Sequence, residues 1–189
     1  MDEERIEQTE MSEPEEHPDK PSAVKEILSW LLWIAIPAVV VLLLNAYVVR
    51  PVRVSGDSMM PTLCDHDILF VTPLKAPERG DIIVFRDENG TALVKRVIAL
   101  GGETVVLDYL SDAVFVDNRL IEEDYLNYAE DDPMEERSES EFSVPEGCVF
   151  VLGDNRNHSA DSRSFGAVEG DSLLGVLVLR IPLGQWLSD

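Results

Sequence analysis

Ser58 is a serine whose setting is suited to a nucleophile. It lies in the turn Ser55–Leu63, directly after an apolar stretch that ends at Val54. Gly56 allows the backbone to approach a substrate closely, and Pro61 fixes one dihedral angle where the chain leaves the turn. Serines in glycine-containing turns more often make local hydrogen bonds. The prediction that Ser58 performs nucleophilic catalysis therefore requires a base elsewhere in the chain.

Lys95 is the candidate base because its neighbours in the run 92–99 are mostly apolar. Alternate residues of a strand face opposite sides, so we expect Lys95 to share a face with Leu93, Val97 and Ala99. Such surroundings disfavour the ammonium form and lower the pKa of a lysine from about 10.4, toward the range in which an amine accepts a proton. The alternative is an edge lysine whose amine reaches water.

Residues 153–166, with the sequence GDNRNHSADSRSFG, form a third polar stretch directly after an apolar run. So many hydrogen-bonding side chains are typical of a loop ordered by its own contacts. Asp161 and Arg163 are expected to pair, and Ser159 is placed to donate or accept a hydrogen bond beside a neutral amine. A calcium-binding EF-hand is excluded because Arg156 occupies its third position. The alternative is a polar surface turn.

The composition excludes several other classes of function. Among 189 residues, 37 are acidic and 15 basic, which gives a net charge of −22 and argues against nucleic acid as a partner. The three histidines are scattered without a metal-binding spacing, so no metal and no cofactor are expected. Cys64 and Cys148 either form a disulfide or remain two free thiols.

The elements that must position these residues are predominantly β-strands. Short apolar runs separated by Gly, Pro, Asn and Asp predict a mostly antiparallel β-sheet or barrel-like domain. We predict strands at Val52–Val54, Ile68–Val71, Asp81–Phe85, Ala92–Leu100, Thr104–Leu107, Ala113–Val116, Cys148–Leu152 and Leu173–Ile181.

Three further segments complete the predicted organisation. Residues 1–26 carry ten acidic groups and few apolar ones, which predicts a disordered tail. Ile27–Val49 contains 23 residues without a charge, enough for one transmembrane helix. Residues 50–189 then form the globular domain, in which the acidic stretch 122–141 is expected to be an exposed loop. Two basic residues flank each end of the helix, so charge does not decide its orientation.

The order of these motifs resembles that of the bacterial type I signal peptidases. An apolar anchor is followed by SGDSMMPTL, RGDIIVF, LVKRVIALGGE and GDNRNHSADSRSFG, over about residues 27–182. Members of this family are membrane-anchored serine proteases that use a Ser–Lys dyad, and the single anchor resembles the Gram-positive subtype. Four ordered motifs make this resemblance more specific than any one of them.

The resemblance implies a role for each catalytic motif. Ser58 would be the acylated nucleophile, with its own amide in the oxyanion hole, and Lys95 would be the general base. Ser159 would hydrogen-bond the lysine amine, and the ion pair of Asp161 and Arg163 would hold the loop in place.

The resemblance also implies a substrate and a location. Val54, Met59, Leu93 and Val94 would bind the signal peptide of a secretory pre-protein as an added strand, with small residues at the cleavage site. Gly56 stands where some members carry a serine that donates to the oxyanion hole. The N-terminus would be cytoplasmic and the catalytic domain extracytoplasmic, so that the plasma membrane bilayer holds enzyme and substrate together.

Two alternatives remain open at this point. Ser58 with His158 and either Asp154 or Asp161 would form a conventional triad, which Lys95→Ala and His158→Ala variants would distinguish. A non-catalytic membrane adaptor that retains the same fold would bind a signal peptide without cutting it.

Overall fold

The computed structural model describes residues 23–126 and 133–184, so the predicted acidic tail lies almost entirely outside the described residues. The chain divides into two compact units, Met1–Val40 and Val41–Asp189. The first element is helix α1, Ala23–Tyr47. Its segment Lys25–Leu43 has a mean hydropathy of 2.3, and by length and composition it is able to cross a membrane.

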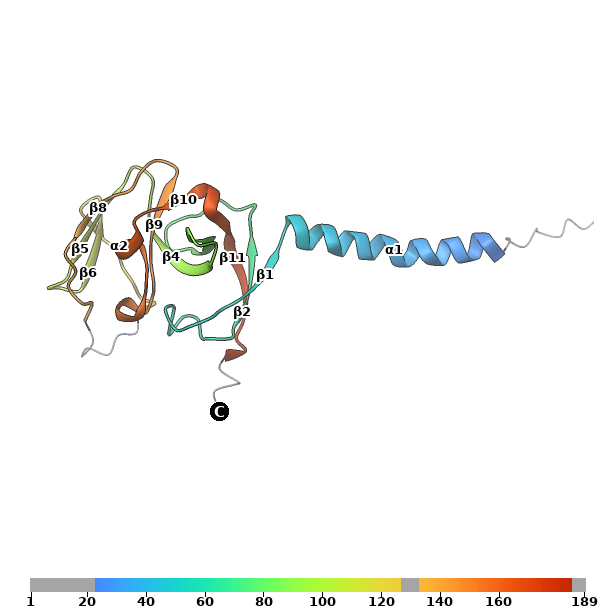
Figure 1. The fold of residues 1–189 in the computed structure, drawn as a ribbon, viewed down its shortest axis with the longest axis horizontal. Coiled ribbons are helices and arrows are strands. Elements are labelled where there is room, and N and C mark those ends of the chain that lie inside the picture. The colour runs from blue at the N-terminus through green and yellow to red at the C-terminus, as the bar shows by residue number, and fades with distance from the viewer. Residues whose placement is uncertain (1–22, 127–132, 185–189) are drawn as a thin grey trace, which may run out of the picture. The chain divides into compact units, whose positions relative to one another are not determined.

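The β domain is built around a seven-stranded antiparallel sheet (Figure 1). Its strands follow the order β1-β2-β11-β3-β4-β9-β10, so the long C-terminal strand enters the middle of the sheet. The strands are β1 Arg50–Arg53, β2 Ile68–Thr72, β3 Ile82–Arg86, β4 Ala92–Leu100, β9 Cys148–Leu152, β10 Val168–Glu169 and β11 Leu173–Ile181.

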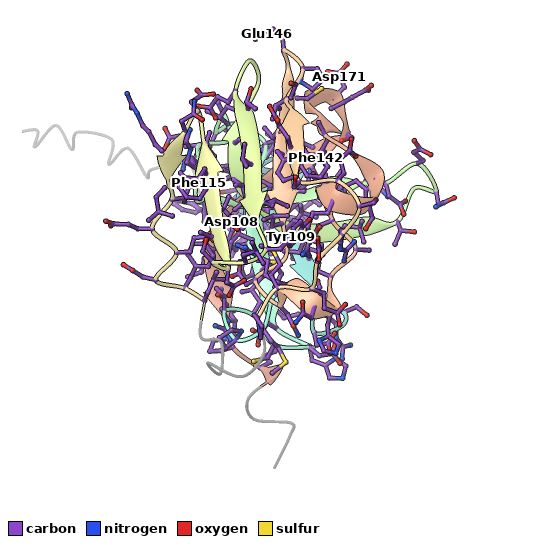
Figure 2. All side chains as sticks on the ribbon, turned by 90° about the vertical axis from the view of Figure 1, so that its left-hand side faces the viewer. Asp108, Tyr109, Phe115, Phe142, Glu146 and Asp171 are labelled. Carbon is purple, nitrogen blue, oxygen red and sulfur yellow. The ribbon has the colours of Figure 1, made fainter. Side chains whose placement is uncertain are left out.

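A second antiparallel sheet has the order β7-β6-β5-β8. Its strands are β5 Thr104–Asp108, β6 Ala113–Val116, β7 Arg119–Leu120 and β8 Glu141–Ser143. Figure 2 faces this sheet and shows Phe115 on β6 and Phe142 on β8. The ring of Phe142 packs on Phe150 of β9, with ring centroids 5.0 Å apart, and so joins the small sheet to the large one.

The prediction of a mostly antiparallel β domain preceded by one apolar helix is confirmed, although both sheets are open rather than closed into a barrel. All eight predicted strands are present, with ends within two residues of the expected ones. Strands β7, β8 and β10 have only two or three residues, too few to show an alternating pattern.

One detail of strand β4 differs from the prediction. The pairing of β4 with β9 shifts register between Val97 and Ala99. As a result, Ile98 and Ala99 both pack in the core cluster beneath the small sheet, whereas Val97 packs in another cluster with Ile83. Lys95 therefore shares its face with Val97 but not with Ala99, because a β-bulge interrupts the alternation.

The described parts of the acidic stretch 122–141 are not uniformly exposed. Met134 is only 2% exposed and belongs to the core cluster under the small sheet. The Glu123 carboxylate pairs with Arg156, with its side chain only 8% exposed. The expectation of an exposed loop is therefore wrong for these two residues, because side-chain partners elsewhere in the domain hold them in place. Cys64 and Cys148 are both free and partly buried.

Candidate active site

Ser58 and Lys95 meet at the centre of the candidate site. The Lys95 Nζ lies 2.8 Å from Ser58 Oγ and 2.9 Å from the carbonyl oxygen of Val94. Lys95 is only 3% exposed, although it lies 37 residues from Ser58 in sequence. Burial lowers the pKa of Lys95, and the nearby carboxylates of Asp161 and Asp154 oppose this effect only in part.

The turn that carries Ser58 is anchored in the core on both sides of the serine. Val54 and Met59, at 4% and 1% exposure, pack in the cluster formed with strands β2 and β3. Gly56 has a φ of +90°, which favours glycine, and its amide donates to Asp65 Oδ1 at 3.0 Å. Gly56 thus shapes the turn, and its own amide already donates a hydrogen bond to Asp65.

The loop after β9 holds Ser58 through the backbone. The amide of Asn155 donates to the Ser58 carbonyl at 3.0 Å, and its side-chain Nδ2 donates to the carbonyl of Asp57 at 3.2 Å. Gly153 allows this approach, since a Cβ there would lie 2.6 Å from the Ser58 carbonyl oxygen and 2.2 Å from Ser159 Oγ. The close approach fixes the position of the Ser58 backbone relative to the loop after β9.

Asp161 and Arg163 form the expected ion pair. Arg163 donates from Nε and Nη2 to the two carboxylate oxygens, both at 2.8 Å, and the pair is fully buried. Asp161 also caps the one-turn helix α2, Ser162–Phe165, and accepts from the amide of Gly153 at 3.1 Å. The pair therefore braces the loop where it passes Ser58.

Ser159 differs from the expectation. Its hydroxyl is buried but makes no hydrogen bond within residues 23–126 and 133–184, whereas the Lys95 amine contacts Ser58 and Val94 instead. Ser159 nevertheless lies near the Ser58 backbone, because a Cβ built on Gly153 would meet both Ser159 Oγ and the Ser58 carbonyl oxygen. The expected hydrogen bond between Ser159 and Lys95 is therefore not formed.

Sequence reasoning missed a second buried ion pair beside the first. Arg96, the neighbour of Lys95, donates to both carboxylate oxygens of Asp154 at 2.8 and 2.6 Å. Its guanidinium carbon also lies 3.7 Å from the centroid of the Tyr125 ring. A charged residue within an apolar strand was the available signal, since such a residue needs a buried partner.

The four expected substrate-binding residues fall into two groups. Val54 and Met59 are core residues, and both backbone groups of Val54 are bonded to the segment His66–Asp67. Leu93 and Val94 lie on strand β4 before Arg96, where β3 pairs on one side and the pairing with β9 has not yet begun. This part of β4 is an open edge next to Lys95.

His158 is not joined to Ser58. It is exposed, and its Nδ1 lies 3.2 Å from Asn155 Oδ1. The geometry therefore favours Lys95 over His158 as the partner of the serine. Within the described part of the chain, no group of three potential metal ligands is present.

Comparison with known proteins identifies the family of this chain. Residues 27–182 match the family described as signal peptidase, peptidase S26. Signal peptidase IB of Staphylococcus aureus strain COL is 32% identical over 173 residues, which covers 82% of this chain and 90% of that protein. Signal peptidase I of Bacillus caldolyticus is 36% identical over 154 residues, which covers 75% and 84%.

Among solved structures, a signal peptidase I from Enterococcus faecalis V583 is 38% identical and covers 55% of this chain and 98% of its own, with a TM-score of 0.46. The family match spans most of this chain, and two relatives exceed 30% identity over most of their length. This chain therefore belongs to the signal peptidase family, peptidase S26.

Proposed function

We propose that this protein is a serine endopeptidase that removes signal peptides from exported pre-proteins, with Ser58 as nucleophile and Lys95 as general base. The observation that carries the proposal is the 2.8 Å contact between a buried lysine amine and the serine hydroxyl. Burial lowers the pKa of Lys95, so the amine is neutral at a lower pH than an exposed lysine would be.

The neutral amine accepts the Ser58 hydroxyl proton while Oγ attacks the scissile carbonyl carbon. The tetrahedral intermediate collapses as the protonated Lys95 gives its proton to the leaving amine, which releases the mature protein and leaves the signal peptide esterified to Ser58. Lys95 then takes a proton from the water that attacks this ester and returns it to Ser58 Oγ as the Oγ–acyl bond breaks, which releases the signal peptide and restores the neutral amine. The hydrogen bond to the Val94 carbonyl orients the amine throughout these steps.

The surrounding residues support these steps. The Ser58 amide donates no hydrogen bond to any residue that the structure describes, which suits a donor to the oxyanion. Asp161 and Arg163 hold the loop in place. Ser159, whose Oγ lies next to Gly153 in this loop, is the proposed further hydrogen-bonding group for the amine. Gly56 shapes the turn without a side-chain oxyanion donor.

The substrate binds as a strand added to the open edge of β4, through the backbone of Leu93 and Val94. Support comes from the missing neighbour strand before Arg96. Val54 and Met59 lie in the core cluster that anchors the Ser58 turn. Their proposed role is to limit the depth of the pockets that receive small residues at the cleavage site. Main-chain pairing supplies affinity, and the pockets supply the size preference.

Helix α1 anchors the enzyme in the plasma membrane, with the N-terminus in the cytoplasm and residues 50–189 outside. Support comes from the length and apolar character of Lys25–Leu43. The apolar part of a signal peptide also enters the bilayer, so a shared membrane raises the frequency of encounters between enzyme and substrate.

The test is to incubate detergent-solubilised protein with a pre-protein and to sequence the new N-terminus. We expect one cut after a small residue, no cleavage by Ser58→Ala or Lys95→Ala, and nearly full cleavage by the matched control His158→Ala. Cleavage that survives Lys95→Ala but is lost in His158→Ala would contradict the assignment of the base. A wild-type protein that binds the signal peptide without cutting it would indicate an adaptor.

A further inference from the structure

Glu123 makes a buried contact that the proposed catalytic steps do not use. Its Oε1 accepts a hydrogen bond from Arg156 Nη2 at 2.6 Å, and the two side chains are 8% and 1% exposed. Glu123 precedes the part of the acidic stretch outside the described residues, and Arg156 lies 33 residues later in the loop after β9. A buried carboxylate with this geometry holds its partner firmly, because each charge depends on the other for solvation.

Arg156 also forms hydrogen bonds with the part of the loop that faces Ser58. Its Nε donates to the carbonyl of Gly153 at 3.0 Å, and its own carbonyl accepts from Arg163 Nη2 at 2.5 Å. Gly153 is the residue that packs against the Ser58 carbonyl and Ser159. One guanidinium group thus lies between Glu123 and the closest approach of the loop to the nucleophile.

Tyr125 links the same carboxylate to the strand that carries the base. Its hydroxyl donates to Glu123 Oε1, and its ring lies 3.7 Å from the guanidinium carbon of Arg96. Arg96 follows Lys95 directly on β4 and pairs with Asp154 of the loop. Glu123 and Tyr125 therefore contact both the strand that presents the base and the loop that holds the nucleophile.

The other described flank of the acidic stretch contacts the same loop. The amide of Glu135 donates to Asn157 Oδ1 at 2.9 Å, and Asn157 Nδ2 donates to the Pro133 carbonyl at 3.0 Å. Arg137 donates from Nη1 to Ser164 Oγ at 2.6 Å. Contacts on both flanks indicate that the described ends of the acidic stretch brace the loop.

We propose that Glu123 and Tyr125 are positioning residues, which fix the loop 153–166 against strand β4 and so set the approach of Ser58 to Lys95. The proposal rests on the proposed function. It assigns a role to the N-terminal end of the acidic stretch. The exposed side chains of Glu122 and Asp124 make no such contact with residues 23–126 or 133–184.

The test compares full-length Glu123→Gln with Glu122→Gln, the same chemical change at the exposed preceding residue. Steady-state cleavage of a pre-protein is measured and normalised to the folded fraction from circular dichroism. We expect kcat of Glu123→Gln to fall by about 10²-fold, with KM within about 3-fold, because displacement of catalytic groups affects the transition state more than binding of an extended peptide. Glu122→Gln should keep the kcat of the wild type.

A double variant tests whether the contact with Arg156 transmits the effect. If Glu123 acts through Arg156, Glu123→Gln combined with Arg156→Gln should lose no more kcat than the worse single variant. Additive losses would overturn the proposed route. An unchanged kcat for folded Glu123→Gln, or a loss fully explained by a smaller folded fraction, would overturn the positioning role.

Tyr125→Phe provides the second variant if Glu123→Gln fails to fold. It keeps the ring over Arg96 and removes only the hydroxyl that donates to Glu123. We expect kcat to fall by about 5-fold at an unchanged KM, and an unchanged kcat would overturn the proposal. Wild-type protein that cuts no pre-protein would refute the proposed function instead, so the two failures are distinguishable.

Discussion

Replacement of Gly153 by alanine tests whether the tight packing around Ser58 affects the cleavage rate beyond its effect on stability. Gly153 is buried, and its added Cβ would lie 2.2 Å from Ser159 Oγ, 2.5 Å from Ser159 Cβ and 2.6 Å from the Ser58 carbonyl oxygen. Real Cβ atoms essentially never come within 3.0 Å of such neighbours. The loop and the Ser58 turn must therefore move apart by several tenths of an ångström.

The size of this displacement sets the expected loss of activity. A misplacement of about 1 Å in catalytic groups costs about 10²-fold in rate, so a smaller shift of Ser58 from Lys95 should lower kcat by between about 10-fold and 10²-fold. Overpacking of a buried position should also lower the free energy of unfolding by about 1–3 kcal/mol. The loss of rate should exceed the loss of folded protein.

Gly101→Ala is the matched control. A Cβ at Gly101 would lie 2.9 Å from both the Gly147 nitrogen and the Pro145 oxygen, in a turn that contains no proposed site residue. Single-turnover cleavage of a pre-protein, normalised to the folded fraction, should drop for Gly153→Ala and stay unchanged for Gly101→Ala. Equal cleavage rates for folded Gly153→Ala and wild type would refute this account of the close packing.

Substitutions at two further positions test the loop. Ser159→Ala removes a buried hydroxyl that has no partner in the described residues. Unfolding experiments should therefore show unchanged or slightly higher stability, and lower stability would contradict the structure. A fall in kcat would indicate that the hydroxyl contacts the Lys95 amine during turnover. Asp161→Ala leaves the buried Arg163 without its carboxylate and should cost about 3–5 kcal/mol of unfolding free energy in denaturant titrations. Asp161→Asn keeps an acceptor for the Gly153 amide and should cost less; equal losses would contradict the proposed bracing.

The strands were predictable from the sequence because alternating apolar residues and turn-forming residues act locally. The same holds for the helix Ala23–Tyr47, whose apolar run is longer than a typical core helix. The register shift between Val97 and Ala99 was not predictable, since a bulge adds one residue without changing the apolar composition. It moved Ala99 from the face of Lys95 to another core cluster.

The candidate site was predictable as a set of residue types but not as a set of contacts. The contact between Ser58 and Lys95 was expected, because both residues lie in motifs that can be recognised in the sequence. The pairs Arg96–Asp154 and Arg156–Glu123 join residues 58 and 33 positions apart, and no local pattern determines which buried charges find one another. The same limit explains Ser159, because a hydroxyl rotamer depends on packing that the sequence does not display.

The protonation of Lys95 is the most direct test of the proposed mechanism. The chain contains only four lysines, so full-length protein labelled at lysine Cε should give few carbon resonances in a pH titration followed by nuclear magnetic resonance. The Lys95 signal is identified by its absence in Lys95→Arg. Lys75 is an internal reference, because its hydrogen bond to Asp81 raises the pKa of Lys75.

Burial disfavours the charged form of Lys95, so its titration midpoint should lie below about 10.4 and below that of Lys75. As the pH rises through that lowered midpoint, the amine loses its proton and the rate of pre-protein cleavage should increase in parallel. A Lys95 midpoint at or above that of Lys75 would contradict the central claim that this amine is the neutral base for Ser58.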